Sequence, residues 1–102
     1  MKHILSAKQF SRSDLEYLMS QAKKMDEILA KGGSRVFDEH ILATLFYEPS
    51  TRTRLSFESA MLRLGGRVIS ETDVTFSSQS KWEILEDTIR IVSGYADIIA
   101  IR

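Results

Sequence analysis

The sequence predicts an α/β protein: a three-layer α/β/α domain with a mainly parallel sheet that is incomplete at its C-terminal end. Two observations lead to this class. Segments with apolar residues at helical spacing alternate along the chain with short continuous apolar runs, which are typical of buried strands. The first two of these runs also lie close enough together in the sequence for a right-handed βαβ unit.

The first predicted element is a helix that begins after Ser11. Ser11 and Asp14 have the spacing of a capping box, and Gly32 and Gly33 end the segment. Between these signals, apolar residues recur every three or four positions on one helix face, namely at Leu15, Leu18, Met19, Ala22, Met25 and Leu29. The pattern therefore predicts an amphipathic helix.

A strand, a helix and a second strand are predicted next. Residues 41–47 have the length and composition of a buried strand. Gly65 and Gly66 then end a helix, and residues 67–70 form a short strand. The apolar positions that mark this helix are Phe57, Ala60, Met61 and Leu64.

The last part of the chain predicts a loop, a third helix and a final strand. Residues 72–80 are polar and read as a loop, and Ser80 with Glu83 forms a second capping pattern. The helix would face inward through Leu85, Thr88, Ile89 and Val92 and end at Gly94. Residues 98–101 read as a buried strand. Ligands of open α/β sheets bind beyond such strand ends, so we interpret the sequence as the front part of a longer protein.

Composition excludes several classes of function. The 102 residues suffice for one domain, and fourteen basic residues balance fourteen acidic ones, which argues against a nucleic-acid or membrane-surface partner. The absence of cysteine excludes thiol catalysis and fits a reducing, cytoplasmic location. Because His3 and His40 are isolated, we expect no metal, and no glycine fingerprint indicates a nucleotide cofactor. We expect no cofactor.

Residues 50–54 carry the strongest functional signal. The apolar run gives way at Pro49 to Ser-Thr-Arg-Thr-Arg, and a helical pattern follows. Unpaired N–H groups at a helix N-terminus bind anions, hydroxyls add hydrogen bonds, and a guanidinium can grip two phosphate oxygens. A plainer interpretation, with capping hydroxyls and solvated arginines, explains one hydroxyl but not three that alternate with two arginines. The segment therefore predicts a phosphate site.

Two later cations are further candidates. Lys81 lies in a polar stretch with Ser77, where it is either a solvated surface charge or part of a loop that closes over an anion. Trp82 beside it either anchors the start of the helix or offers a stacking platform. Arg102 follows the final strand on the side where ligands bind, so we favour a ligand as its partner.

Taken together, these segments resemble the N-terminal, carbamoyl-phosphate-binding domain of the aspartate carbamoyltransferases. The main support is the FYEPSTRTRLSFE segment at residues 46–58, which resembles the signature that aspartate and ornithine carbamoyltransferases share. Residues 63–66, and residues 86–97 leading to Arg102, add to it. The loop that contains Ser77 and Lys81, four residues apart, resembles the loop of the aspartate branch. Trp82 departs from the pattern, because the family usually has a glycine after this lysine.

The resemblance implies roles for individual residues. Ser50, Thr51, Arg52 and Thr53 would hold the phosphate of carbamoyl phosphate, and Thr53 and Arg102 would reach the carbamoyl oxygen. Ser77 and Lys81 would enter the site of a neighbouring subunit of a homotrimer. The catalytic set it implies is Arg52, Thr53, Lys81 and Arg102. L-Aspartate would be the acceptor and would bind a second domain outside residues 1–102, so this chain alone is expected to be inactive. The family also allows a regulatory subunit.

Two alternatives stay open on the sequence. The acceptor could be ornithine or another amine, which Lys81 disfavours and Trp82 keeps open. The chain could also be a non-catalytic, anion-binding or trimer-forming paralogue that keeps the phosphate site and performs no transfer.

Overall fold

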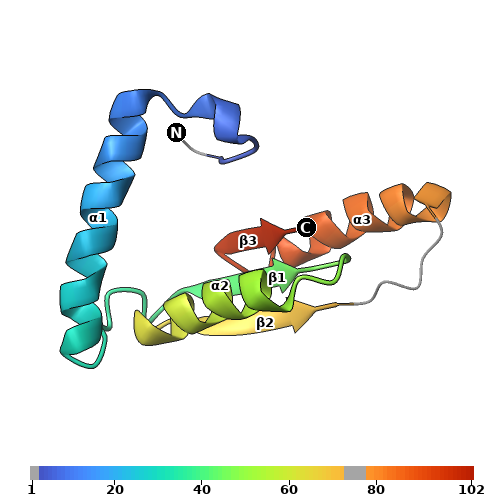
Figure 1. Cartoon of the computed structure of the whole chain (residues 1–102). Helices are drawn as coiled ribbons and strands as arrows, with labels where there is room; N and C mark the ends of the chain where they lie inside the picture. Colours follow the sequence, from blue (N-terminus) through green and yellow to red (C-terminus); the bar gives the residue numbers. More distant parts are fainter. Residues whose placement is uncertain (1–2, 73–77) are drawn as a thin grey trace. The chain divides into compact units, whose positions relative to one another are not determined.

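The computed structural model describes residues 3–72 and 78–102, leaving aside the side chains of residues 78–84. Its internal contacts divide the chain into two units, Met1–Gly32 and Gly33–Arg102. Figure 1 shows the order of their elements along the chain.

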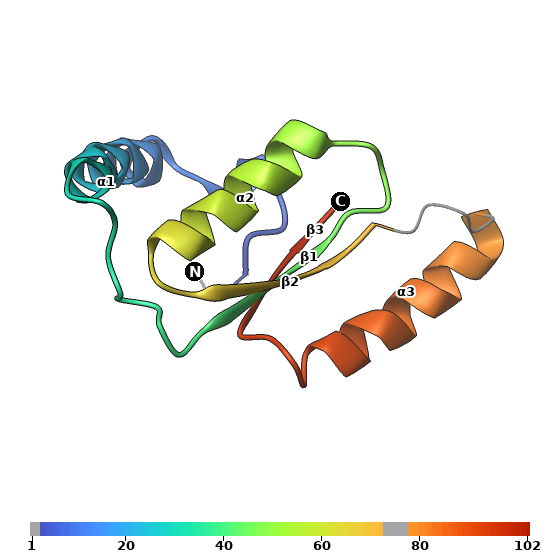
Figure 2. The same ribbon diagram turned by 90° about the horizontal axis from the view of Figure 1, so that it is seen from below.

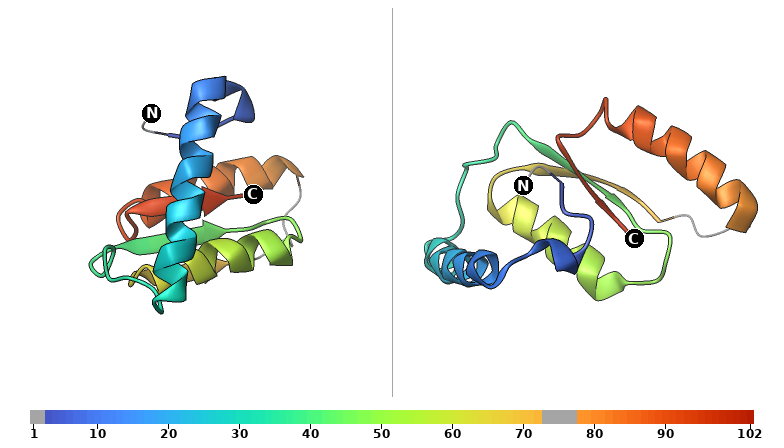
Figure 3. Two further views of the ribbon diagram at one scale, coloured as in Figure 1. Left: turned by 60° about the vertical axis from the view of Figure 1, so that its left-hand side comes forward. Right: turned by 90° about the horizontal axis from the view of Figure 1, so that it is seen from above.

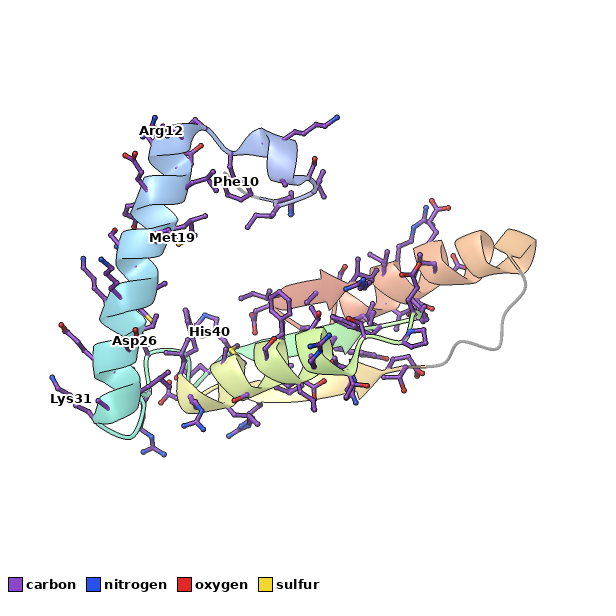
Figure 4. All side chains as sticks on the ribbon, viewed as in Figure 1. Phe10, Arg12, Met19, Asp26, Lys31 and His40 are labelled. Carbon is purple, nitrogen blue, oxygen red and sulfur yellow. The ribbon has the colours of Figure 1, made fainter. Side chains whose placement is uncertain are left out.

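The first unit contains the 3₁₀ helix η1 (Ala7–Gln9) and the helix α1 (Arg12–Ala30). The Ser11 capping box predicted from sequence is confirmed, since the Ser11 hydroxyl accepts from the Asp14 N–H and the Asp14 carboxylate accepts from the Ser11 N–H. The helix ends before Gly32, which adopts a φ of +93° that favours glycine. Figure 4 shows the side chains of α1, from Arg12 at its first residue to Lys31 just beyond its last. No residue of α1 is buried in the described part of the chain.

The second unit contains a three-stranded parallel sheet in the order β2-β1-β3. The strands are β1 (Ile41–Leu45), β2 (Arg67–Glu71) and β3 (Ile98–Ile101). Ala43 in the central strand lies opposite Ile69 of β2 and Ile99 of β3. The predicted parallel sheet is therefore confirmed.

Helices α2 (Thr51–Arg63) and α3 (Ser78–Val92) connect the strands and lie on opposite faces of the sheet (Figures 2 and 3). This arrangement gives the three layers expected from the sequence. The apolar core gathers on β1 and the two residues after it, with one contribution from α2. It consists of Leu42, Ala43, Leu45, Phe46, Tyr47 and Met61. The predicted inward face of α3 is half-buried at Leu85, Thr88, Ile89 and Val92.

Two element boundaries and the burial of β3 differ from the sequence-based expectation. Helix α3 begins at Ser78, so Ser80 lies inside the first turn rather than before the helix, and the predicted loop is shorter. Strand β1 ends at Leu45 rather than at residue 47, although the N–H groups of Phe46 and Tyr47 still donate to carbonyls at the ends of β2 and β3. Strand β3 is not buried: Ile98 is 47% and Ile101 45% exposed, because within the described residues β3 pairs only with β1.

The C-terminal end of α2 is fixed by the loop before β1. The N–H of Ser34 donates to the carbonyl of Arg63 at 2.8 Å, and that of Phe37 to the carbonyl of Leu64 at 3.0 Å. Gly65, with a φ of +89°, passes so close to the loop that a Cβ there would lie 2.7 Å from the Cα of Arg35. Glycine is therefore required at this crossing.

Among the described residues, no helix is both long and apolar enough to cross a membrane.

Candidate anion site at the start of helix α2

The candidate site lies where the carboxyl ends of the three strands meet. The N–H of Phe46 donates to the carbonyl of Glu71 on β2 at 2.9 Å. The N–H of Tyr47 donates to the carbonyl of Arg102 beyond β3 at 2.8 Å. These bonds hold the segment after β1 between its two neighbours, and the chain then turns into α2. The start of α2 and the end of β3 are thereby brought to the same edge of the sheet.

The first turn of α2 presents free backbone donors. Ser50 occupies the N-cap position, but its side chain makes no capping hydrogen bond. The first bonded N–H of the helix is that of Arg54, which donates to the Ser50 carbonyl at 3.0 Å. The N–H groups of Thr51, Arg52 and Thr53 precede it and have no partner within the helix. The first turn also contains no acidic residue, so its partial positive charge is left for an anion.

Arg102 joins this turn from the far end of the chain. Its Nη1 donates to the Ser50 Oγ at 3.0 Å, while that hydroxyl makes no capping bond to the helix. Its Nε lies 3.8 Å from Glu48 Oε2, a long contact between two side chains that are each about half exposed. Such an exposed pair contributes little. The guanidinium therefore remains available to a ligand at the strand ends.

The remaining predicted residues of this turn are open to solvent in different degrees. Arg52 and Thr51 are exposed, and Thr53 is half-buried. Among the described residues, the Arg52 side chain has neither an ion-pair nor a hydrogen-bond partner. It is thus a cation without an internal role, at the end of a helix where anions bind.

Arg54, the second arginine of the motif, has a different place. Its Nη1 lies 3.1 Å from Glu58 Oε2, one helical turn further on. The same carboxylate oxygen accepts from Thr44 Oγ1 of β1 at 3.0 Å and from Ser70 Oγ of β2 at 3.3 Å. Arg54 is therefore committed to the interface between α2 and the sheet. The plainer interpretation of two solvated arginines does not hold for it.

Sequence reasoning missed this polar cluster of Thr44, Arg54, Glu58 and Ser70. Two signals could have indicated it. Arg54 and Glu58 are four residues apart, the spacing of an ion pair on a helix. Thr44 interrupts an apolar strand, and a buried hydroxyl needs a partner.

The predicted residues of the 72–82 region are not all placed by the structure. Ser77 lies outside the described residues. The backbone of Lys81 belongs to the first turns of α3, but its side chain and that of Trp82 also lie outside the description. Their roles remain predictions. In the part of the chain that is described, no group of three or more His, Asp or Glu could hold a metal ion.

Comparison with known proteins agrees with this geometry. The family model described as the carbamoyl-P binding domain of aspartate/ornithine carbamoyltransferase matches residues 2–102. The aspartate carbamoyltransferase catalytic subunit of Methanocaldococcus jannaschii is 53% identical, with 100% of this chain and 34% of the relative covered. That of Clostridium novyi is 56% identical over 101 residues, 99% of this chain and 33% of the relative.

Solved structures give the same result. The catalytic subunit of M. jannaschii aspartate transcarbamoylase superimposes with a TM-score of 0.88, covering 100% of this chain and 34% of the other. Aspartate transcarbamoylase from Trypanosoma cruzi, in complex with N-(phosphonacetyl)-L-aspartic acid, is 41% identical with a TM-score of 0.82, covering 99% and 33%. The chain spans about a third of the length of these relatives. It belongs to the aspartate/ornithine carbamoyltransferase family, within the carbamoyl-P binding domain.

Proposed function

We propose that the protein transfers the carbamoyl group of carbamoyl phosphate to the amine of L-aspartate, a step of de novo pyrimidine biosynthesis. The products would be N-carbamoyl-L-aspartate and phosphate. The observation that carries the proposal is the uncapped first turn of α2, with Arg52 free beside it and Arg102 bonded to Ser50. The names of the relatives support aspartate as the acceptor, as do the T. cruzi structures that contain carbamoyl aspartate and phosphate.

The proposed mechanism relies on positioning and positive charge. The phosphate binds the N–H groups and hydroxyls of residues 50–53 and the Arg52 guanidinium. Thr53 and Arg102 hold the carbamoyl oxygen. The aspartate amine attacks the carbonyl carbon, negative charge grows on the carbonyl oxygen, and the bond to phosphate breaks. Fixed donors stabilise that charge because they need no reorganisation as the reaction proceeds.

The proposal also covers the domain organisation, the subunit assembly and the location of the protein. Residues 1–102 form the N-terminal part of the carbamoyl-phosphate-binding domain, and aspartate binds a second domain outside this range. Ser77 and Lys81 reach the site of a neighbouring subunit in a homotrimer. The protein is cytoplasmic, and a regulatory subunit is a further candidate partner. The resemblance to the family supports these parts.

A direct assay tests the proposal. The complete native chain, supplied with carbamoyl phosphate and L-aspartate, should form N-carbamoyl-L-aspartate and release phosphate. L-Ornithine should be a poor acceptor. Transfer to ornithine alone would favour the second branch of the family, and phosphate binding without transfer to either amine would favour a non-catalytic paralogue. Residues 1–102 alone should give no product above background, since nothing then holds the amine in attack geometry.

Mixing two inactive variants tests the shared site. Lys81→Ala and Arg52→Ala chains, dissociated and reassembled together, should recover part of the activity, because a mixed trimer contains sites with both residues intact. Each variant reassembled alone is the control. If verified mixed trimers recover nothing, Lys81 does not act across the subunit boundary.

A further inference from the structure

Helix α2 lacks the usual means of holding its first turn. An N-cap hydroxyl that is bonded to the helix normally stabilises the first turn, and helix ends fray. The Ser50 hydroxyl is bonded to Arg102 instead. A turn that binds an anion through three backbone N–H groups must nevertheless keep their directions fixed. An interaction other than a cap therefore has to fix the directions of these N–H groups.

The polar cluster defined above occupies the interface between α2 and the sheet. Glu58 is its centre, since the donors from Thr44, Arg54 and Ser70 all reach the same carboxylate oxygen. The Thr44 Oγ1 also lies 3.0 Å from the Ser70 Oγ, so the single Thr44 proton can serve either Glu58 or Ser70. The cluster therefore joins α2 to both β1 and β2 through hydrogen bonds, beside the apolar contact of Met61.

The cluster is partly shielded from solvent, which strengthens its hydrogen bonds. Thr44 is fully buried, and the side chains of Arg54 and Glu58 are 27% and 17% exposed. Hydrogen bonds to a carboxylate are about twice as strong as neutral ones, and partial burial reduces screening by salt. A register shift of α2 along the strands would leave the Glu58 charge half-buried without donors, which is costly.

The two ends of α2 are thus held by different means. The loop at residues 34–37 fixes the C-terminal end through backbone hydrogen bonds. Arg54 connects the other end, because its N–H makes the first helical bond to Ser50 while its guanidinium is bonded to Glu58. Movement of the first turn is therefore coupled to the Glu58 carboxylate.

We propose that Glu58 is a positioning residue for the anion site: by holding Thr44, Arg54 and Ser70, it fixes the direction of the free N–H groups at residues 51–53. This proposal rests on the proposed function of that site. Glu58 acts through α2 and touches no substrate. It also keeps Arg54 on the sheet, so that Arg52 is the arginine of α2 that serves the phosphate.

Glu58→Gln separates positioning from simple electrostatics because the two effects have opposite signs. Removing a negative charge near an anion site should strengthen phosphate binding if charge alone matters. If Glu58 positions the turn, binding should weaken. We expect the complete native chain with Glu58→Gln to bind inorganic phosphate roughly three- to tenfold more weakly by calorimetry, with a matching rise in KM for carbamoyl phosphate.

Thr44→Val removes one hydrogen-bond donor without changing charge or shape, and it should also weaken the binding of inorganic phosphate. Thr44→Ser retains the hydroxyl and should bind phosphate as tightly as the unaltered chain. Ser70→Ala, at an exposed position, keeps the test decisive if Thr44→Val does not fold. Unchanged or tighter phosphate binding in Glu58→Gln and Ser70→Ala, even with a lower melting temperature, would show that the cluster is only structural. If the unaltered complete chain binds neither phosphate nor carbamoyl phosphate, that result would instead refute the proposed function itself.

Discussion

Helices α1 and α2 both begin after a serine, yet their first turns are built differently. At α1, Ser11 accepts from the Asp14 N–H at 3.2 Å and donates its own N–H to the Asp14 carboxylate at 2.9 Å. At α2, the residue three positions after Ser50 is Thr53, which cannot complete such a box, and the serine hydroxyl is turned toward Arg102. One turn is closed by its own side chains and the other is left open.

The difference separates a capped helix terminus from one whose backbone donors stay open, as the proposed phosphate site requires. An acidic residue at the third position stabilises α1 by neutralising its N-terminal dipole. The same residue at position 53 would place a carboxylate in the proposed phosphate site. Helix α2 therefore gives up its cap and relies on the sheet, through Glu58, for the order that a cap would supply. Three substitutions and one titration test this contrast between the first turns of α1 and α2.

Arg52→Ala should have the largest effect. If the guanidinium holds the leaving phosphate, its loss should lower kcat/KM of the complete chain by about 10²–10³. Arg12→Ala is the matched control, since Arg12 lies in the first turn of α1, is exposed, and among the described residues forms an ion pair only with Glu16. It should leave the kinetics unchanged. Near-normal turnover by Arg52→Ala would refute the mechanism.

Ser50→Ala should weaken ligand binding without weakening the helix. The hydroxyl bonds to Arg102 and not to the turn, so its loss frees Arg102 and removes a donor from the site. We expect phosphate affinity to fall about three- to tenfold. The melting temperature should stay near that of the unaltered protein. A large drop in melting temperature with unchanged affinity would mean that Ser50 is an ordinary cap.

Ser11→Ala should show the reverse behaviour. It removes a working cap, which typically contributes about 1 kcal/mol to helix stability. The expected result is less helical signal or a lower melting temperature, with kcat and KM unaltered. A change in KM for carbamoyl phosphate would contradict the separation of the two termini.

The smallest expected effect is a pH dependence at α1. Hydrogen bonds from the backbone and side chain of Ser11 hold the pKa of Asp14 below its ordinary value of 3.8. Because the folded pKa is the lower one, the ionised carboxylate stabilises the helix above about pH 4 and this contribution is lost as pH falls through the folded pKa. The helicity of Asp14→Asn should therefore not show this loss as the pH falls below about 4. An NMR titration of Asp14 that gave an unshifted pKa would contradict it.

Much of the fold could be predicted from the sequence because it rests on local signals. The capping box at Ser11, the glycine after α1 and each apolar run that marks a strand are signals that span only a few residues. The exposure of β3 was missed, because an apolar run looks the same in a central strand and in one paired on a single side. The early start of α3 was missed because its first residues are polar.

The candidate site divides in the same way. The position of residues 50–53 at the start of α2 could be predicted because the apolar strand, Pro49 and the helical pattern follow one another in the sequence. The separate fates of Arg52 and Arg54 could not, because they depend on Thr44 and Ser70, which meet the helix only in the folded sheet. The bond between Ser50 and Arg102 also joins residues 52 positions apart.

A crystal structure of the complete native chain with carbamoyl phosphate, or with a phosphonate analogue, tests the central claim most directly. We predict phosphate oxygens within about 2.7–3.2 Å of the N–H groups of Thr51, Arg52 and Thr53, with the Arg52 guanidinium on the same group and no anion at the start of α1. A phosphate bound elsewhere, with the first turn of α2 empty or capped by its own Ser50 hydroxyl, would contradict the account.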